Sequence, residues 1–328
     1  MTTRILLTVD TELVWRHHAA GHDWRENFAR SYEAAGVGIP YQLAKLREHD
    51  LRACFFVDPM PAAVHGLDPV KRMVEPILAA GQEVQLHLHP FWANLERAER
   101  NRRTDELTAY DFEAQRDLIV KARDLLVAAG VPNPIAFRSG SYAANADTAR
   151  ALAELGFRYD SSHNGSHHPS PSALPLPPET IAPVEIGPGL IELPVSQIGG
   201  ADGLRHLQIC AVSFAEMRGA LLAAQRAGQP VVTIVSHSFE LATRNGLTVN
   251  RVVRRRFDRL CAFLDQQRAT LPAASFATLP SLPLDRSATP APGSQHRRLR
   301  RMAGQAWGNL RYERFAARAA ERRQAHVG

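Results

Sequence analysis

A regular alternation of short strand-like runs with longer amphipathic segments is the feature that most constrains the fold. The strand-like runs are residues 4–9, 52–57, 83–88, 135–138, 157–160, 231–236 and 275–279. Helical patterns lie near residues 28–49, 68–80, 106–129, 145–155, 213–227 and 249–267. Such alternation predicts an α/β fold with a parallel sheet, and seven strands come close to the number that closes a barrel. A doubly wound open sheet also fits the pattern.

Length and composition indicate one large domain with an appendage. The chain has 328 residues, 45% of them hydrophobic, which is enough to bury a full-sized core. Residues 283–295 are rich in proline, glycine and small polar residues, as a linker would be. We therefore expect a barrel at 1–285, and a linker with a basic helical tail at 286–328. Residues 163–190 are predicted to form a long loop before the strand-like run 190–195.

The basic charge is concentrated in the tail. From Ser287 onward there are nine arginines against two glutamates, whereas the whole chain carries a net charge of only +6. The arginines of residues 296–323 alternate with apolar residues, as in an amphipathic helix. Such a helix could lie on an anionic membrane or remain a solvated extension, and we weigh these two equally. Nucleic acid is an unlikely partner because no recognition motif accompanies the charge.

The N-terminus and the cysteines bear on the compartment. No run of about 18 apolar residues could span a bilayer, and the chain enters a strand pattern without a signal peptide. Cys54, Cys210 and Cys261 are widely spaced within apolar segments, as buried hydrophobic residues would be. We expect a cytoplasmic protein, peripheral on the inner membrane if the tail docks there.

Polar residues gather at the predicted carboxyl ends of the strands, where α/β folds place their chemistry. Asp10 and Glu12 follow the first strand one residue apart, so in an extended backbone both carboxylates point the same way. One could bind a cation and the other act as a base. A helix N-cap explains this pair equally well.

Two histidines end the third strand. His87 and His89 are two residues apart, so their imidazoles project from one face of a strand and can converge on a metal. A carboxylate with two histidines leaves coordination positions open for water and substrate, as catalytic sites do. Such a metal activates water and polarises a carbonyl, so hydrolysis of an amide or ester is expected.

Six segments together resemble the polysaccharide deacetylase family, also called NodB-homology or carbohydrate esterase family 4. They are residues 7–12 (LTVDTE), 53–57 (ACFFV), 83–90 (EVQLHLHP), 137–142 (FRSGSY), 192–195 (ELPV) and 235–237 (VSH). Their order and spacing carry the resemblance more than any single segment. The fold that it implies is a distorted (β/α)7-type barrel.

The resemblance also implies roles for individual residues. Asp10 would be the general base, His87 a metal ligand, Arg138 the partner that orients the base, and His237 the acid that protonates the departing amine. The family usually has adjacent aspartates and a second histidine four residues after the first, but this chain has Thr11 and Phe91 there.

Replacement ligands lie close by. We predict that Glu12 and His89 replace the missing ligands. An alternative is that Asp10 is the carboxylate ligand. A further alternative is that the protein has lost its metal altogether. The expected ion is a divalent metal: zinc, or else cobalt or manganese.

Other residues near strand ends are weaker candidates. Tyr142 and Trp92 are predicted to contact substrate, although packing explains both. Asp58 and Asp160 could line the cleft or serve as caps. Arg138 and His237 could be structural residues, but their position at strand ends favours function. Six further histidines are expected in solvated loops without a metal: His17, His18, His22, His163, His167 and His168.

These observations predict a hydrolase that removes an acyl group, with acetyl expected, from an N-acylated amino sugar. The substrate would be a carbohydrate or lipid-linked glycan precursor. One alternative keeps the barrel and hydrolyses a small non-sugar amide. Another is a metal-free glycan-binding or tail-tethered protein.

Overall fold

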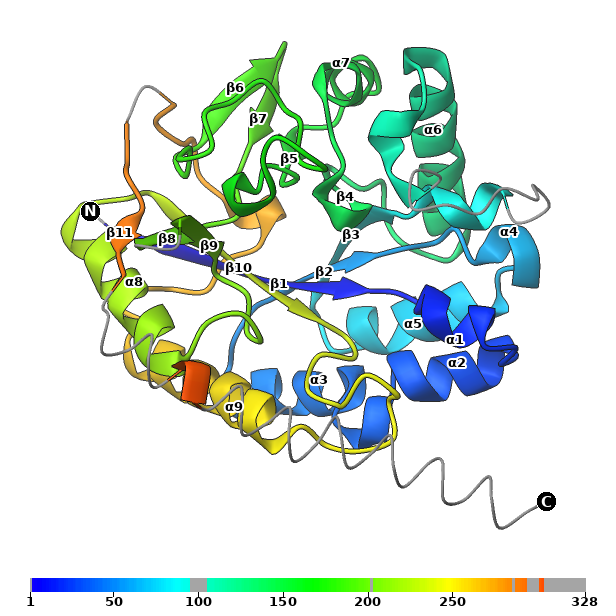
Figure 1. Ribbon diagram of the computed structural model, residues 1–328, viewed down its shortest axis with the longest axis horizontal. Helices are drawn as coiled ribbons and strands as arrows, with labels where there is room; N and C mark the ends of the chain where they lie inside the picture. Colours follow the sequence, from blue (N-terminus) through cyan, green and yellow to red (C-terminus); the bar gives the residue numbers. More distant parts are fainter. Residues whose placement is uncertain (1, 95–104, 201–202, 285–286, 294–300, 304–328) are drawn as a thin grey trace.

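The computed structural model describes residues 2–94, 105–200, 203–284, 287–293 and 301–303. Its main sheet has eight strands in the order β10-β1-β2-β3-β4-β5-β7-β6 (Figure 1). The bounds are β10 (Val231–His237), β1 (Arg4–Thr11), β2 (Cys54–Val57), β3 (Glu83–Leu88), β4 (Ala136–Ser139), β5 (Tyr159–Asp160), β7 (Leu190–Glu192) and β6 (Val184–Gly187). The seven strands from β10 to β7 are parallel, and β6 pairs antiparallel with β7. The parallel α/β sheet is therefore confirmed.

The segment after β7 joins the two sides of the curled sheet. The amide of Leu193 donates to the carbonyl of Asp160 on β5 at 2.8 Å. The amide of Ser196, three residues later, donates to the carbonyl of Thr233 on β10 at 3.1 Å. The chain therefore crosses from β5 to β10 within a few residues. This crossing completes a distorted seven-stranded barrel, as predicted.

Helices lie around the outside of the barrel (Figure 1). They are α1 (Trp15–Ala19), α2 (Trp24–Ser31), α3 (Ile39–Glu48), α4 (Ala62–His65), α5 (Asp68–Ala79), α6 (Phe112–Ala128), α7 (Ala146–Glu154), α8 (Phe214–Arg226) and α9 (Arg251–Gln266). Short 3-10 turns occupy Ala34–Gly36, Pro90–Asn94, Leu107–Ala109, Gly140–Tyr142, Gly165–His167 and Phe276–Thr278. Gly81 and Gly156 follow α5 and α7 with φ of 69° and 78°, the left-handed conformation expected after a helix.

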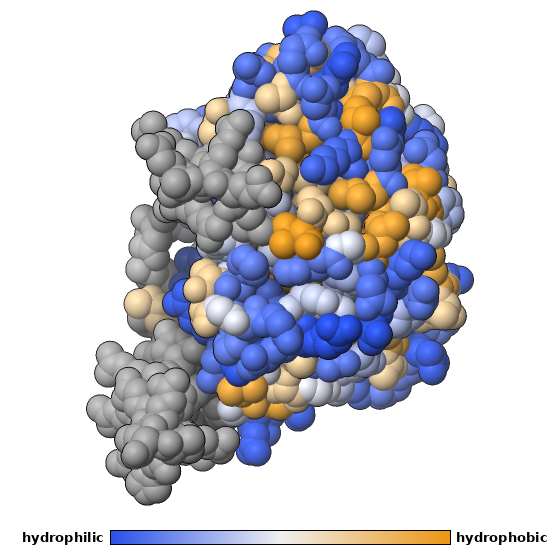
Figure 2. All heavy atoms as spheres, turned by 90° about the vertical axis from the view of Figure 1, so that its right-hand side faces the viewer, coloured by the Kyte–Doolittle hydropathy of each residue, from blue (hydrophilic) through white to orange (hydrophobic). Residues whose placement is uncertain are grey.

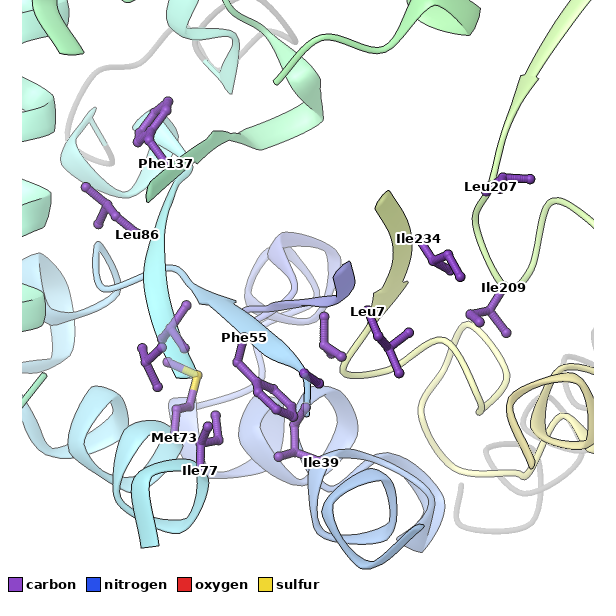
Figure 3. Packing of buried hydrophobic residues seen from close by; sticks show 14 of the residues in the cluster. Leu7, Ile39, Phe55, Met73, Ile77, Leu86, Phe137, Leu207, Ile209 and Ile234 are labelled. Carbon is purple, nitrogen blue, oxygen red and sulfur yellow. The ribbon is translucent and has the colours of Figure 1, made fainter. Parts of the chain in front are cut away.

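Side chains alternate between two buried environments along each strand. Leu7, Phe55, Leu86 and Ile234 belong to the large cluster that includes the helix side chains (Figure 3). Leu6 and Phe56 belong to a separate cluster with Phe276. Both faces of the strands are therefore apolar, which explains their continuous hydrophobic runs.

Three predicted elements differ in the structure. Residues 275–279 form a 3-10 turn instead of a strand, because the amides of Phe276 and Ala277 each donate to the carboxylate of Glu83 at 2.8 Å. The predicted helix 28–49 is broken into α2 and α3 at Ala34 and Ala35, which adopt positive φ. The predicted helix 106–129 contains a 3-10 turn first, and α6 begins at Phe112 after the N-cap Asp111.

The predicted linker contributes to a second sheet. Ala291–Pro292 forms β11, which pairs with β8 (Gln197–Gly200), and β8 pairs with β9 (Gly203–His206). The predicted loop 163–190 likewise contains β6. Within the tail 296–323, only residues 301–303 are described, so the amphipathic helix lies outside the described residues.

The face shown in Figure 2 is mainly hydrophilic where it is described, with scattered apolar patches. Among the described residues, four large apolar side chains are strongly exposed: Val64, Val127, Leu247 and Met302. No helix within these ranges combines the length and apolarity needed to cross a membrane.

Candidate active site

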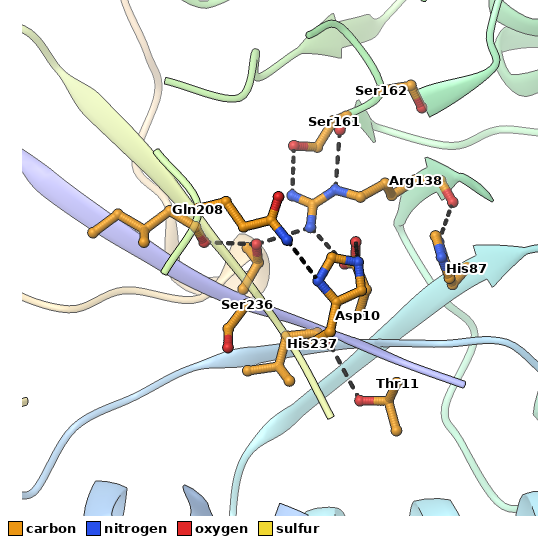
Figure 4. Close-up of polar contacts among 12 residues, drawn as sticks. Asp10, Thr11, His87, Arg138, Ser161, Ser162, Gln208, Ser236 and His237 are labelled. Carbon is orange, nitrogen blue, oxygen red and sulfur yellow. Dashed lines mark hydrogen bonds and ion pairs between the residues drawn. The ribbon is translucent and has the colours of Figure 1, made fainter. Parts of the chain in front are cut away.

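Four strands carry the predicted site residues to one end of the barrel. Asp10 lies near the end of β1, His87 on β3, Arg138 on β4 and His237 at the end of β10. Figure 4 shows Asp10, Arg138 and His237 close together, with His87 nearby. Because the strands are parallel and in register, their carboxyl ends meet at this edge.

A buried ion pair forms the centre of the site. Arg138 Nη1 donates to Asp10 Oδ1 at 2.6 Å and to Thr8 Oγ1 at 2.8 Å. Its Nε and Nη2 donate to the carbonyl and hydroxyl of Ser161 at 3.1 and 3.0 Å. The guanidinium also lies over the ring of Phe56, 4.3 Å from the centroid. These contacts fix Arg138 in one orientation.

The ion pair determines the charge of Asp10. Burial acts to raise the pKa of Asp10, but Arg138, His87 and His237 outweigh it, so the pKa lies below its ordinary value. Asp10 is therefore an ionised carboxylate, as a general base must be. Its Oδ1 accepts from Arg138, and its Oδ2 lies 3.9 Å from Nε2 of His237.

The three predicted metal ligands form a second group beside this pair. Within the described ranges, Glu12, His87 and His89 are the group whose ligand atoms all lie within 4.8 Å of one another. Glu12 Oε2 is 2.6 Å from His89 Nε2 and 3.9 Å from His87 Nε2. Asp10 is not a member of this group. The geometry thus favours Glu12 over Asp10 as the carboxylate ligand.

The outer nitrogen of each imidazole faces an oxygen. His87 Nδ1 lies 2.7 Å from the carbonyl of Arg138, and His89 Nδ1 lies 3.0 Å from Asp105 Oδ1. A protonated Nδ1 directed at an oxygen acceptor leaves Nε2 as the ligand atom, which is the usual arrangement of metal-bound histidine. Two histidines and a glutamate also match a common zinc ligand set. The residues present therefore fit a divalent cation.

The charges at this group are consistent with a cation position. Burial acts to raise the pKa of Glu12, but His89 and His87 outweigh it and bring the value to about 2. Burial lowers the pKa of His87 to about 4, whereas Glu12 and Asp105 raise that of His89 well above its ordinary value. The contact between His89 Nε2 and Glu12 Oε2, 2.6 Å long, is the one that a bound cation would replace.

Access to the site follows from exposure. The side chains of Asp10 and Arg138 are 3% and 0% exposed, whereas those of His237 and Glu12 are 20% and 14% exposed. A substrate therefore approaches from the side of His237 and Glu12.

The predicted substrate contacts have different positions. Trp92 is 1% exposed and packs edge-on against Trp15 and His18, so it serves packing in this structure, and its predicted contact with substrate stays a prediction. Tyr142 is buried as well, but its φ of 61° is strained for a tyrosine, and its ring lies 5.6 Å from His167. Its predicted contact with substrate stays a prediction.

Asp58 and Asp160 are both buried carboxyls beside strand ends. Burial raises the pKa of Asp58 to about 7 and that of Asp160 to about 6. Asp58 Oδ1 accepts from the amide of Met60. Asp160 pairs in register with Glu192, and Ser162 donates to it at 2.6 Å. Asp160 thus supports the segment that holds Arg138.

The expectation that all six loop histidines are solvated is wrong for two of them. His163 is 0% exposed and His17 is 4% exposed. His163 is buried because its amide donates to Glu192 Oε1 at 2.9 Å and its carbonyl accepts from Val195, which places the loop inside the barrel wall. His17 and His18 both lie on helix α1, so the prediction of a loop is wrong for both.

Sequence reasoning missed four residues that contact the site: Thr8, Asp105, Ser161 and Gln208. Thr8 shares the face of Asp10 by the two-residue period of a strand, a signal that was available. Ser161 directly follows the predicted strand 157–160. Asp105 and Gln208 carry no sequence signal, because each reaches its histidine through tertiary packing.

No family model and no curated protein matches the chain. Solved structures do match. A protein from Mycobacterium smegmatis assigned to the polysaccharide deacetylases matches with 21% identity and a TM-score of 0.53, over 88% of this chain and 95% of the other. A family 4 carbohydrate esterase from Streptomyces lividans, solved with acetate, matches with 15% identity and a TM-score of 0.41, over 88% and 98%. At that score it adds nothing to the argument.

A third match has a different activity in its name. The 4-alpha-glucanotransferase from Thermococcus litoralis matches with 11% identity and a TM-score of 0.50, over 89% of this chain and 41% of the other. The fold alone therefore does not fix the reaction, and the site must decide it. The chain has the fold of the polysaccharide deacetylases, as its sequence motifs predicted.

Proposed function

We propose that this protein is a metal-dependent hydrolase that removes an acetyl group from an N-acetylated amino sugar of a glycan or glycan precursor. One observation carries the proposal: the ionised, arginine-held Asp10 lies at the same barrel end as the group Glu12, His87 and His89. A base beside a cation site is the arrangement needed to direct water at an amide carbonyl.

Asp10 removes a proton from the attacking water. Its Oδ1 is held by Arg138, so Oδ2 is the oxygen left to accept the proton. Arg138 keeps the carboxylate ionised and oriented before the reaction, which lowers the cost of reaching the transition state. General-base catalysis of this kind contributes about 10²- to 10⁴-fold.

His237 serves the departing nitrogen. Its Nε2 is the ring atom that faces Asp10 Oδ2, at 3.9 Å, and the ring is the most exposed of the catalytic side chains. A substrate amide bound over these two atoms, on the exposed side of His237, would therefore contact both the base and the imidazole. His237 donates from Nε2 as the amine leaves.

Glu12, His87 and His89 would hold the cation, with zinc as the first choice and cobalt or manganese as alternatives. When bound, the cation would polarise the substrate carbonyl and make water more acidic. The outer contacts of His87 and His89, to Arg138 and Asp105, keep both rings aimed inward.

The substrate class and location are parts of the same proposal. The fold shared with the M. smegmatis protein supports a carbohydrate, and a lipid-linked precursor suits a cytoplasmic enzyme peripheral to the inner membrane. The basic tail would provide the membrane contact. Its residues are largely outside the described ranges, so its support is the charge pattern of the sequence.

The test is acetate release from N-acetylated chito-oligosaccharides and from a lipid-linked N-acetylglucosamine, with zinc-loaded protein. We expect metal-dependent release that falls about 10²-fold or more in Asp10→Asn. Lys71→Gln, on the exposed face of α5, is the control and should keep full activity. Hydrolysis of simple acylamides but of no sugar would contradict the carbohydrate substrate. No hydrolysis of either would contradict the enzyme.

A further inference from the structure

The segment after β9 carries a glutamine to the catalytic histidine. The amide of Val235 donates to the carbonyl of Leu207 at 2.9 Å, and the amide of Ile209 donates to the carbonyl of Val235 at 3.0 Å. These main-chain bonds fix residues 207–209 along β10. Gln208 therefore lies next to His237, and Figure 4 shows its side-chain amide directed at the imidazole ring.

Glu240 determines which way round the Gln208 amide lies. The two ends of an amide are alike in shape, so their hydrogen-bond partners decide the orientation. One end of Gln208 lies 2.6 Å from Glu240 Oε1, and a carboxylate accepts only. Glu240 also accepts from Ser236 Oγ at 3.1 Å, which holds the carboxylate in place. This end of Gln208 is therefore the NH2 group.

The other end of the amide has a matching partner. Gln208 Oε1 lies 2.5 Å from His206 Nε2, and His206 Nδ1 lies 2.8 Å from Ser166 Oγ. Burial lowers the pKa of His206 to about 4, so this ring is neutral. Nε2 donates to the glutamine oxygen in the tautomer in which Nδ1 accepts from Ser166 Oγ, a hydroxyl that also lies 2.7 Å from Asn164 Oδ1. The orientation of Gln208 thus rests on Glu240, and the His206 contact is compatible with it.

The second hydrogen of the NH2 group points at His237. Gln208 Nε2 is 3.2 Å from His237 Nδ1, so Nδ1 must be the acceptor. A neutral imidazole carries one proton, and it therefore lies on Nε2, the nitrogen that faces Asp10 Oδ2.

We infer that Gln208 is a positioning residue that sets the tautomer of His237, with its proton on the nitrogen that faces the reacting groups. The inference rests on the proposed function for its catalytic meaning. In its neutral form, His237 then directs a hydrogen-bond donor from Nε2 toward the reacting groups. Glu240 and His206 act one step further out, because they fix the orientation of Gln208.

The imidazolium form needs a different partner for Nδ1. Its added proton on Nδ1 would face the NH2 group of Gln208, and Glu240 Oε1 lies 3.9 Å from this nitrogen. Gln208 is thus the Nδ1 partner of the neutral His237 ring, and Glu240 is the Nδ1 partner of its imidazolium form. The neutral state has the shorter contact.

The test is nitrogen NMR of the zinc-loaded full chain labelled with 15N-histidine, at about pH 8, where an ordinary imidazole is neutral. His237 is assigned by the signals missing from His237→Ala. We expect Nε2 protonated and Nδ1 unprotonated in the wild type. A protonated Nδ1 in the wild type would overturn the inference.

Two variants test the role of Gln208 itself. Gln208→Met and Glu240→Gln should each produce a mixture of tautomers, whereas Gln115→Met, which removes a buried amide in α6, should leave His237 unchanged. An unchanged tautomer in both site variants would also overturn the inference.

Kinetics provide a separate readout. We expect kcat of Gln208→Met to fall by about 10-fold to 100-fold with KM little changed, since the amide orients a catalytic group and need not bind substrate. If no substrate is hydrolysed at all, the proposed function fails. The NMR result still decides the tautomer.

Discussion

Asp105 should control the metal affinity of the site through His89. The Asp105→Asn substitution keeps the size of the side chain but weakens the contact between its oxygen and His89 Nδ1, which is 3.0 Å in the structure. Loss of such an outer contact costs about 10-fold to 100-fold in metal affinity. The side chain of Asp105 is 28% exposed, so solvent already screens the contact. We therefore expect about a tenfold loss, or about 1.4 kcal/mol.

The assay is calorimetric titration of zinc into metal-stripped protein. The control is Asp111→Asn, the same substitution at the N-cap of α6, where Asp111 accepts from the amide of Ala114 and asparagine caps equally well. The control should bind zinc like the wild type. The reasoning is refuted if Asp105→Asn binds within twofold of the wild type, or if Asp111→Asn loses as much affinity.

Two further predictions concern buried charges. Arg138→Met should lower the free energy of unfolding in urea by about 3–5 kcal/mol, because it leaves the Asp10 carboxylate buried and unpaired. Adding Asp10→Asn to this variant should recover part of the loss. If the effects of the two substitutions simply add, the pairing is contradicted. Burial raises the pKa of Asp160 to about 6 and that of Glu192 well above its ordinary value. The pair therefore stabilises the fold most at acid pH, where both carboxyls are protonated. This contribution of the pair to the free energy of unfolding is lost as pH rises through the two raised pKa values. Glu192→Gln should therefore flatten the fall in stability between about pH 4 and pH 8, and an unchanged profile in urea melts would contradict the shared burial.

The fold followed from the sequence because local pattern and global packing agree along most strands. The elements that differed depend on distant contacts. Phe276 turns because Glu83, far away in the sequence, accepts from its amide. α2 and α3 separate at Ala34 and Ala35, whose positive φ no alanine pattern predicts.

The centre of the site was predictable for a related reason. Asp10 and His87 lie on strands and Glu12 directly follows one, so the two-residue period and shared strand direction bring all three to one edge. Asp105 and Gln208 were not predictable, because each meets its histidine from a segment that no local pattern places there. His163 was predicted to be solvated, but it is buried because its amide donates to Glu192, which lies on another segment of the chain.

The most direct test of the account is the number of zinc ions bound per chain in three proteins: wild type, His87→Ala with His89→Ala, and Asp10→Asn. We predict about one ion in the wild type and in Asp10→Asn, because Arg138 holds Asp10 outside the group of Glu12, His87 and His89. We predict no ion in the double variant. No zinc in the wild type, or its loss in Asp10→Asn, would contradict the account.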